Sequence, residues 1–177
     1  MGYARILILF ILLLKIVTHM EIGYNSYQGS IPWQFGNMSE LRYLDIAGAN
    51  LSGTIRNELG TLVNLATLFL FKNSLFGMIL NEFGNISMIS SLDLSDNLLS
   101  SPILDSFSNL KSLKLSSAMY NDMNGFVPEG IAKLPNLESL LIWDNFFSGT
   151  LPQELASKLP LCLRMSTGSA RLKENED

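Results

Sequence analysis

A single residue type, asparagine, recurs along this chain with a fixed period. Asn25, Asn73, Asn97, Asn121 and Asn145 are separated by multiples of 24 residues. An alternating apolar pair precedes all of these positions except Asn121 by five and three residues, and a glycine usually follows by four. A chain with such a period folds as a coil of similar turns, because each turn can bury its apolar side only against its neighbours.

The repeated unit has the form LxxLxLxxNxLxGxIP, which is typical of leucine-rich repeats. The alternating pair predicts a short strand in each turn, with apolar side chains inward and variable ones outward. We therefore predict an α/β fold, a right-handed leucine-rich repeat solenoid of about six 24-residue turns. Short parallel strands line its concave face, and 3₁₀ or irregular segments form its convex side. The pairs are Met20/Ile22, Leu44/Ile46, Leu68/Leu70, Leu92/Leu94 and Leu140/Ile142.

Other repeated positions have equally definite physical roles. The asparagine amide is expected to satisfy backbone groups of adjacent turns, which would otherwise be buried without partners. Position 49 lacks this amide, because Ala49 stands there with Asn50 beside it. The Ile-Pro ending should stop regular pairing and begin the return along the convex side. Apolar residues three positions apart in each return segment, such as Leu62 and Leu65, predict short 3₁₀ or α turns.

The fifth turn departs from the pattern. Ser116 and Ala118 occupy the positions that the other turns fill with large apolar residues. Truncating one buried leucine to alanine typically costs roughly 2–5 kcal/mol. We therefore expect this turn to be the least stable part of the coil.

The chain divides into an apolar N-terminal segment (1–13), a repeat domain (14–158), and a degenerate repeat with a charged tail (159–177). The apolar run from Ile6 to Leu14 has the length of a secretory-signal core; the alternative is the chance start of a truncated reading frame. One cysteine, Cys162, permits no internal disulfide cap, so we expect a fragment of a longer protein. Residues 171–177 are expected to be a solvated, disordered end.

The sequence offers little for catalysis. The single histidine, His19, and Cys162 should lie roughly 25–30 Å apart, given about 4.8 Å between stacked strands. No phosphate-binding glycine loop, CxxC pair or HExxH motif is present. A net charge of −4 provides no basic surface for nucleic acid. We therefore expect no enzyme activity, no cofactor, no metal site and no nucleic-acid partner.

What remains is the concave face, where the residues beside each inward pair point outward. Exposed aromatic side chains dominate binding hot spots, and interleaved carboxylates would favour a ligand that carries Arg or Lys. The alternative is that these side chains only decorate the coil and lean on neighbouring turns. The candidate ligand-binding residues are Glu21, Tyr24, Tyr43, Asp45, Phe69, Phe71, Asp93, Asp96, Tyr120, Trp143 and Asp144.

Three N-x-S sequons favour a secretory route, because each is a candidate N-glycosylation site. They begin at Asn37, Asn50 and Asn85. Asn37 and Asn85 are 48 residues apart, so they should share one convex-side position two turns apart.

The Gly-x-Ile-Pro ending marks the plant extracellular type of leucine-rich repeat. Over about residues 14–158 the chain resembles ectodomains of plant receptor-like kinases, in particular the tracheary-differentiation (CLE) peptide receptor group and its more-lateral-growth relatives. The resemblance is carried by HMEIGYNSYQG (19–29), YLDIAGANLSG (43–53), DLSDN (93–97), MYNDMNG (119–125) and WDNFFSG (143–149).

This resemblance implies a receptor at the plasma membrane whose extracellular concave face holds a short secreted peptide. A co-receptor ectodomain would be a further partner, and an internal kinase would signal. Membrane association of this chain would come only through the parent receptor or the N-terminal apolar segment. Two other interpretations stay open: a secreted leucine-rich repeat inhibitor of cell-wall-degrading enzymes, and a gene fragment without independent function.

Overall fold

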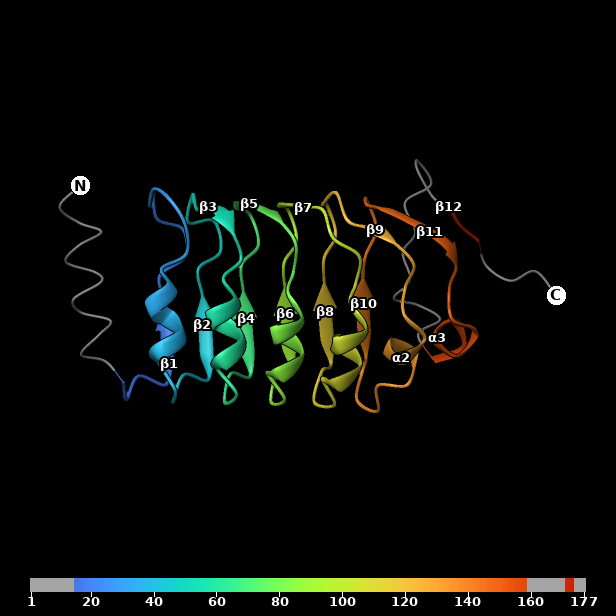
Figure 1. Cartoon of the computed structure of the whole chain (residues 1–177), viewed down its shortest axis with the longest axis horizontal. Helices are drawn as coiled ribbons and strands as arrows, with labels where there is room; N and C mark the ends of the chain where they lie inside the picture. Colours follow the sequence, from blue (N-terminus) through green and yellow to red (C-terminus); the bar gives the residue numbers. More distant parts are fainter. Residues whose placement is uncertain (1–14, 159–170, 174–177) are drawn as a thin grey trace.

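The computed structural model describes residues 15–158 and 171–173. Within them the chain forms a coil whose turns are stacked side by side along the long axis of the molecule (Figure 1). The predicted N-terminal apolar segment, Cys162, most of the degenerate repeat and the last four residues lie outside the described part.

One face of the coil is a parallel sheet with one strand from each turn, in the order β1-β2-β4-β6-β8-β10. Each described pair is in register at an interval of 24 residues, as in His19 with Tyr43 and Leu44 with Leu68. The central residues of the strands point inward, and those of β2, β4 and β6 are fully apolar and buried. The predicted solenoid is therefore confirmed. The strands are β1 (His19–Glu21), β2 (Tyr43–Asp45), β4 (Thr67–Phe69), β6 (Ser91–Asp93), β8 (Leu115–Ser117) and β10 (Ser139–Leu141).

The opposite, convex side carries short helices, as the apolar spacing of three predicts. Each of the first five follows a residue in extended conformation, for example Pro32 and Pro128, which begin the return segments. The core lies between these helices and the sheet, and includes the predicted second apolar ladder with Leu62 and Leu65 fully buried. The helices are η1 (Trp33–Asn37), η2 (Asn57–Thr61), η3 (Asn81–Asn85), η4 (Asp105–Asn109), α2 (Glu129–Ala132) and α3 (Gln153–Lys158).

Close packing of η1, η2 and η3 depends on a column of glycines at 24-residue intervals. A Cβ on Gly60 would lie 2.6 Å from the carbonyl oxygen of Glu82 in the next turn. A Cβ on Gly36 or on Gly84 would likewise lie 2.5 Å from a carbonyl oxygen of the next turn. The backbone of one turn therefore touches the backbone of the next, which leaves no space for a side chain.

The asparagine column fulfils the role predicted for it. The Asn97 Nδ2 donates to the carbonyl oxygens of Leu70, Leu94 and Ser95, each at 3.1 Å. Its Oδ1 accepts the backbone N–H of Leu75 at 3.0 Å. One buried amide thus satisfies backbone groups of its own turn and of the preceding one. Asn73, Asn121 and Asn145 bond equivalent groups.

The second turn has Ala49 at the repeat position of the asparagine, so other groups bond the backbone there. The N–H of Tyr27, which an asparagine Oδ1 would accept, donates instead to the backbone oxygen of Ala49 at 3.0 Å. Asn50 takes a left-handed conformation (φ 56°), and its amide donates to the carbonyl oxygen of Tyr27 at 3.1 Å. Ala49 thus lies next to the first turn, in which Asn25 is exposed.

Two small parallel sheets flank the principal one, and sequence reasoning did not predict them. They have the orders β3-β5-β7 and β9-β11-β12. The gap between them falls at Ser101 and Pro102, where serine replaces the repeated glycine and proline lacks an N–H donor. The strands are β3 (Ser52–Thr54), β5 (Ser74–Gly77), β7 (Leu98–Leu99), β9 (Asn124–Gly125), β11 (Phe146–Thr150) and β12 (Arg171–Lys173).

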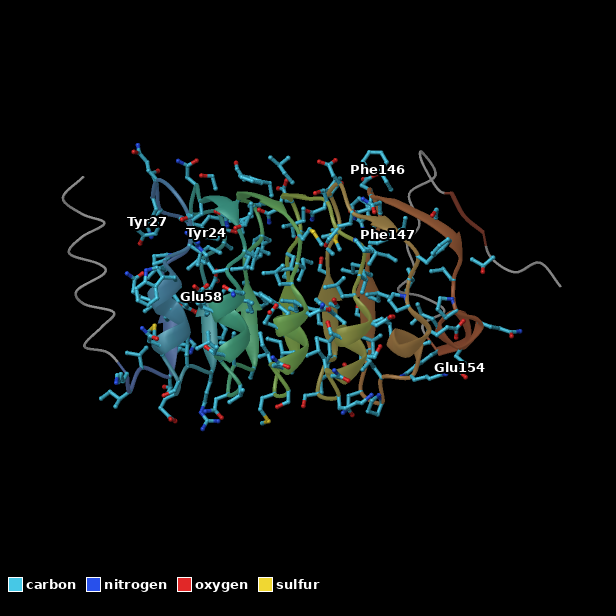
Figure 2. All side chains as sticks on the ribbon, in the orientation of Figure 1. Tyr24, Tyr27, Glu58, Phe146, Phe147 and Glu154 are labelled. Atoms are coloured by element: carbon cyan, nitrogen blue, oxygen red, sulfur yellow. The ribbon has the colours of Figure 1, made fainter. Side chains whose placement is uncertain are left out.

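Strand β12 corrects one expectation. Residues 171–173 were expected to be part of a disordered end, but they pair in parallel with β11. In β11 itself, adjacent aromatic residues point in opposite directions. Phe146 projects from the edge of the coil and is 62% exposed, whereas Phe147 is buried in the core (Figure 2).

The core contains a cavity of about 20 Å³ at the fifth turn. Ser116 lines it together with Ile103, Phe107, Met123 and Leu140. Ser116 pairs in the sheet with Leu92 on one side and Leu140 on the other. The cavity therefore lies where the sequence replaces a large apolar residue by serine.

Candidate functional site

The candidate site is the concave face, defined here as the side of the principal sheet that points away from the core. Each turn contributes the first and third residues of its strand and further residues in the turn that follows. Residues of neighbouring turns stack in columns about 4.8 Å apart, because the parallel strands are in register. The face is therefore a grid, in which the position of a side chain follows from its place in the 24-residue repeat.

The first three turns hold an aromatic cluster on this face. The rings of His19 and Tyr43 stack with centroids 4.1 Å apart and nearly parallel planes. Tyr43 meets Phe69 edge to face at 5.9 Å, and Phe69 meets Phe71 at 6.1 Å. Tyr24 approaches Phe71 at 6.5 Å and is 69% exposed. The predicted aromatic residues of these turns thus form one continuous surface, which we call the aromatic cluster.

Sequence reasoning did not include His19 in the candidate site. The structure adds it, since its ring covers Tyr43 and its Nε2 lies 3.5 Å from a carboxylate oxygen of Glu21. The sequence could have indicated this contact, because His19 and Tyr43 occupy the same repeat position in successive turns.

Carboxylates surround the aromatic cluster and alter its chemistry. Burial, followed by the negative charges of Asp45 and Glu21, raises the pKa of the Tyr43 phenol above its ordinary value. The Tyr43 phenol is neutral at physiological pH even at its ordinary pKa, so this shift leaves its hydrogen-bond donor unchanged there. The Asp45 carboxylate is held in place by the backbone N–H of Ala47, which it accepts at 2.8 Å.

The last two turns of the face carry a second aromatic pair. Tyr120 and Trp143 meet edge to face with centroids 4.4 Å apart. Tyr120 occupies a turn position with left-handed backbone (φ 54°), and the same position holds Asp96 one turn before and Asp144 one turn after, at φ 56° and 52°. Tyr120 therefore stands between two carboxylates.

The fourth turn separates the two aromatic groups and is acidic. Asp93 pairs in register with Phe69 on one side and Ser117 on the other. Its Oδ1 accepts the backbone N–H of Ser95 at 2.9 Å and the Ser95 hydroxyl at 2.6 Å. All eleven predicted residues thus lie on the concave face, in two aromatic groups with an acidic turn between them.

The three sequon asparagines are exposed. Asn37 and Asn85 end η1 and η3, at the same convex-side position two turns apart. Asn50 differs from them, because its amide is already bonded to the carbonyl oxygen of Tyr27. All three lie off the concave face.

Other site types find no support in the part of the chain that the structure describes. No three His, Cys, Asp or Glu side chains gather there as ligands for a metal ion. Among the same residues no helix has the length and apolar character needed to cross a membrane.

Comparison with known proteins identifies the family. The Leucine Rich Repeat family model matches residues 40–62, 88–110 and 136–157. No curated protein matches the chain by sequence. Among solved structures, the ectodomain of BIR2 from Arabidopsis thaliana is 34% identical, with a TM-score of 0.67, over 73% of this chain and 68% of BIR2. The chain belongs to the plant leucine-rich repeat receptor-kinase ectodomains.

Two longer members of this family are also similar to the chain. A TDR receptor is 42% identical, with a TM-score of 0.81, over 89% of this chain and 27% of that receptor. The Arabidopsis receptor kinase HAESA, solved with the peptide hormone IDA and the co-receptor SERK1, is 26% identical with a TM-score of 0.74. The match covers 90% of this chain and 30% of HAESA. The chain thus spans less than a third of the matched chain in each of these two structures.

Proposed function

We propose that this leucine-rich repeat domain is an extracellular peptide-recognition module of a plant receptor kinase, which binds a short extended peptide on its concave face. The observation that carries this proposal is the outward grid of that face. It combines two groups of partly exposed aromatic rings with carboxylates held by their own turns. Rings of this kind provide large contact area on a rigid support, which is the property of binding hot spots.

Partners and location follow from the same proposal. A short secreted peptide is the ligand, and a co-receptor ectodomain is the second partner, as HAESA binds IDA and SERK1. The domain acts at the extracellular side of the plasma membrane, with glycans on Asn37, Asn50 and Asn85. These asparagines lie off the concave face, so glycans there leave it open. The module binds without catalysis.

The test begins by selecting short linear peptides from a synthetic library that bind the full chain. Their affinity is then measured against a Phe71→Ala/Trp143→Ala double variant. We expect Kd to rise about 30-fold, since two hot-spot truncations of about 1 kcal/mol each give roughly this factor. A matched control changes two aromatic residues off the concave face, Trp33 and Phe76, each 49% exposed, to Ala.

The control variant should bind like the unchanged chain, and both variants should keep its thermal unfolding midpoint to within a few degrees. If the control pair weakens binding as much as the concave pair, or if the concave pair has no effect, the peptide does not lie on the concave face.

A further inference from the structure

Three carboxylates on the concave face of the last three turns, Asp93, Asp96 and Asp144, form no ion pair within the described residues. Among the described residues, ion pairs join His19 to Glu21 and Lys114 to Glu138, and neither involves Asp93, Asp96 or Asp144. Lys72 precedes Asp96 by one turn in the same column, yet no ion pair joins them.

Two of these carboxylates flank one aromatic pair. Asp96 and Asp144 stand one turn before and one turn after Tyr120 in a single column, so their Cα atoms are about 10 Å apart, twice the spacing of stacked strands. Trp143 lies edge to face with Tyr120 and is only partly buried. A planar cation against these rings would have a carboxylate on either side.

Asp93 and Ser117 form the inner part of the same region. The two residues are direct partners in the sheet. Asp93 is fixed through its Oδ1 by Ser95, so its carboxylate does not need to be ordered by a ligand. Ser117 is only 2% exposed, and its buried hydroxyl oxygen has no hydrogen-bond partner. Buried polar groups normally have a partner, and this hydroxyl, which can donate or accept, lies beside Asp93 without one.

We propose that Asp93, Asp96, Tyr120, Trp143 and Asp144 form a subsite for the guanidinium group of an arginine in the bound peptide, an inference that rests on the proposed function. A guanidinium stacks on aromatic rings and donates paired hydrogen bonds to carboxylates. An ammonium is a more strongly hydrated point charge and uses this combination less well. The subsite therefore distinguishes arginine from lysine as well as from neutral side chains.

The aromatic cluster sets a second requirement on the ligand. Its Phe69 and Phe71 belong to the third turn, and Tyr120 belongs to the fifth. Two turns correspond to about 10 Å, which an extended chain covers in about three residues. The ligand class is thus an extended peptide in which an apolar residue and an arginine are about three positions apart.

The chain contains two tryptophans, Trp33 and Trp143, so a Trp33→Phe variant makes Trp143 the only indole reporter. This variant is titrated with acetyl-Leu-Phe-Gly-Ser-Arg-Gly-Ser-amide and with the same peptide carrying citrulline or lysine in place of arginine. Trp143 emission reports binding at the subsite, and calorimetry reports binding anywhere on the chain. The arginine peptide should bind at least about 10-fold more tightly than the citrulline peptide, equivalent to about 1.4 kcal/mol, and more tightly than the lysine peptide.

Two further variants in the same background locate the effect. Asp93→Asn/Asp96→Asn should abolish the preference for arginine over citrulline. Glu40→Gln/Asp122→Asn, which removes the same charge from exposed positions elsewhere, should retain it.

Each contrary result has a distinct meaning. Equal affinity for the arginine and citrulline peptides, or for arginine and lysine, overturns the guanidinium subsite and leaves concave-face peptide binding in place. Calorimetric binding that does not change Trp143 emission also overturns the subsite. Failure of all three peptides to bind, combined with failure to select any peptide from the library, overturns the proposed function as well.

Discussion

At the scale of single residues, the role of the asparagine column could be predicted from the sequence. An amide has donors and an acceptor, and its period of 24 residues puts it beside the backbone of the preceding turn, so its role could be predicted before any coordinates. The substitute at Ala49 could not, because it depends on a left-handed conformation of Asn50 and a rerouted Tyr27 N–H. Ring contacts such as His19 on Tyr43 likewise depend on side-chain rotamers.

Replacing Asn97 by alanine should lower the free energy of unfolding by about 3 kcal/mol. The change leaves the buried Leu75 N–H and three carbonyl oxygens short of a partner, and each such loss costs about 1–3 kcal/mol before relaxation. Urea denaturation of the full chain measures the effect. Asn25→Ala is the matched control, since that amide is exposed and bonds only its own turn. Equal losses in the two variants would contradict the role assigned to the column.

At the scale of elements, five strands of the principal sheet follow directly from the alternating apolar pairs, and the sixth, β8, follows from the 24-residue period. The two flanking sheets do not, because their strands are short, partly exposed and lack a strong apolar alternation. Their interruption at Ser101 and Pro102 has a physical cause in the sequence, but this becomes visible only once the strands are located. The glycine column of the convex side was missed for a similar reason. Its role is close backbone approach, which no local pattern reports.

Gly60→Ala should destabilise the coil by about 1–3 kcal/mol, the usual effect of adding an atom to a fully packed position. The new Cβ would lie 2.6 Å from the Glu82 carbonyl oxygen, so η2 and η3 would have to separate. Asn57→Ala, at the exposed first position of η2, should change stability by no more than about 0.5 kcal/mol. Thermal denaturation of both variants checks this, and a stable Gly60→Ala protein would show that the helices are not in backbone contact.

Ser116→Val should stabilise the fifth turn by about 1 kcal/mol, because the added methyl groups fill the cavity and remove a hydroxyl from an apolar environment. Ser91→Val makes the same chemical change in a neighbouring strand, at an outward position, and separates strand propensity from cavity filling. Denaturant titration compares the two. If Ser91→Val stabilises the chain as much as Ser116→Val, the cavity is not the source of the gain.

At the scale of the whole molecule, the fold and the family were accessible from the sequence, because a 24-residue repeat leaves one way to bury its apolar positions. The concave location of the candidate residues could be predicted from the alternation of inward and outward side chains along each strand alone. Their division into an aromatic cluster, an acidic turn and a second aromatic pair required the stacked register of all six turns. A ligand that crosses several turns would contact this sequence of surfaces in order.

Hydrogen exchange of the full chain, with and without a peptide selected from the library, tests this account most directly. We predict that the bound peptide slows exchange in consecutive strands of the principal sheet and in the turns that follow them. The segments concerned are residues 66–72, 90–96, 114–120 and 138–144. Slower exchange confined to the convex helices or to the flanking sheets, with the concave strands unchanged, would contradict peptide recognition by the concave face.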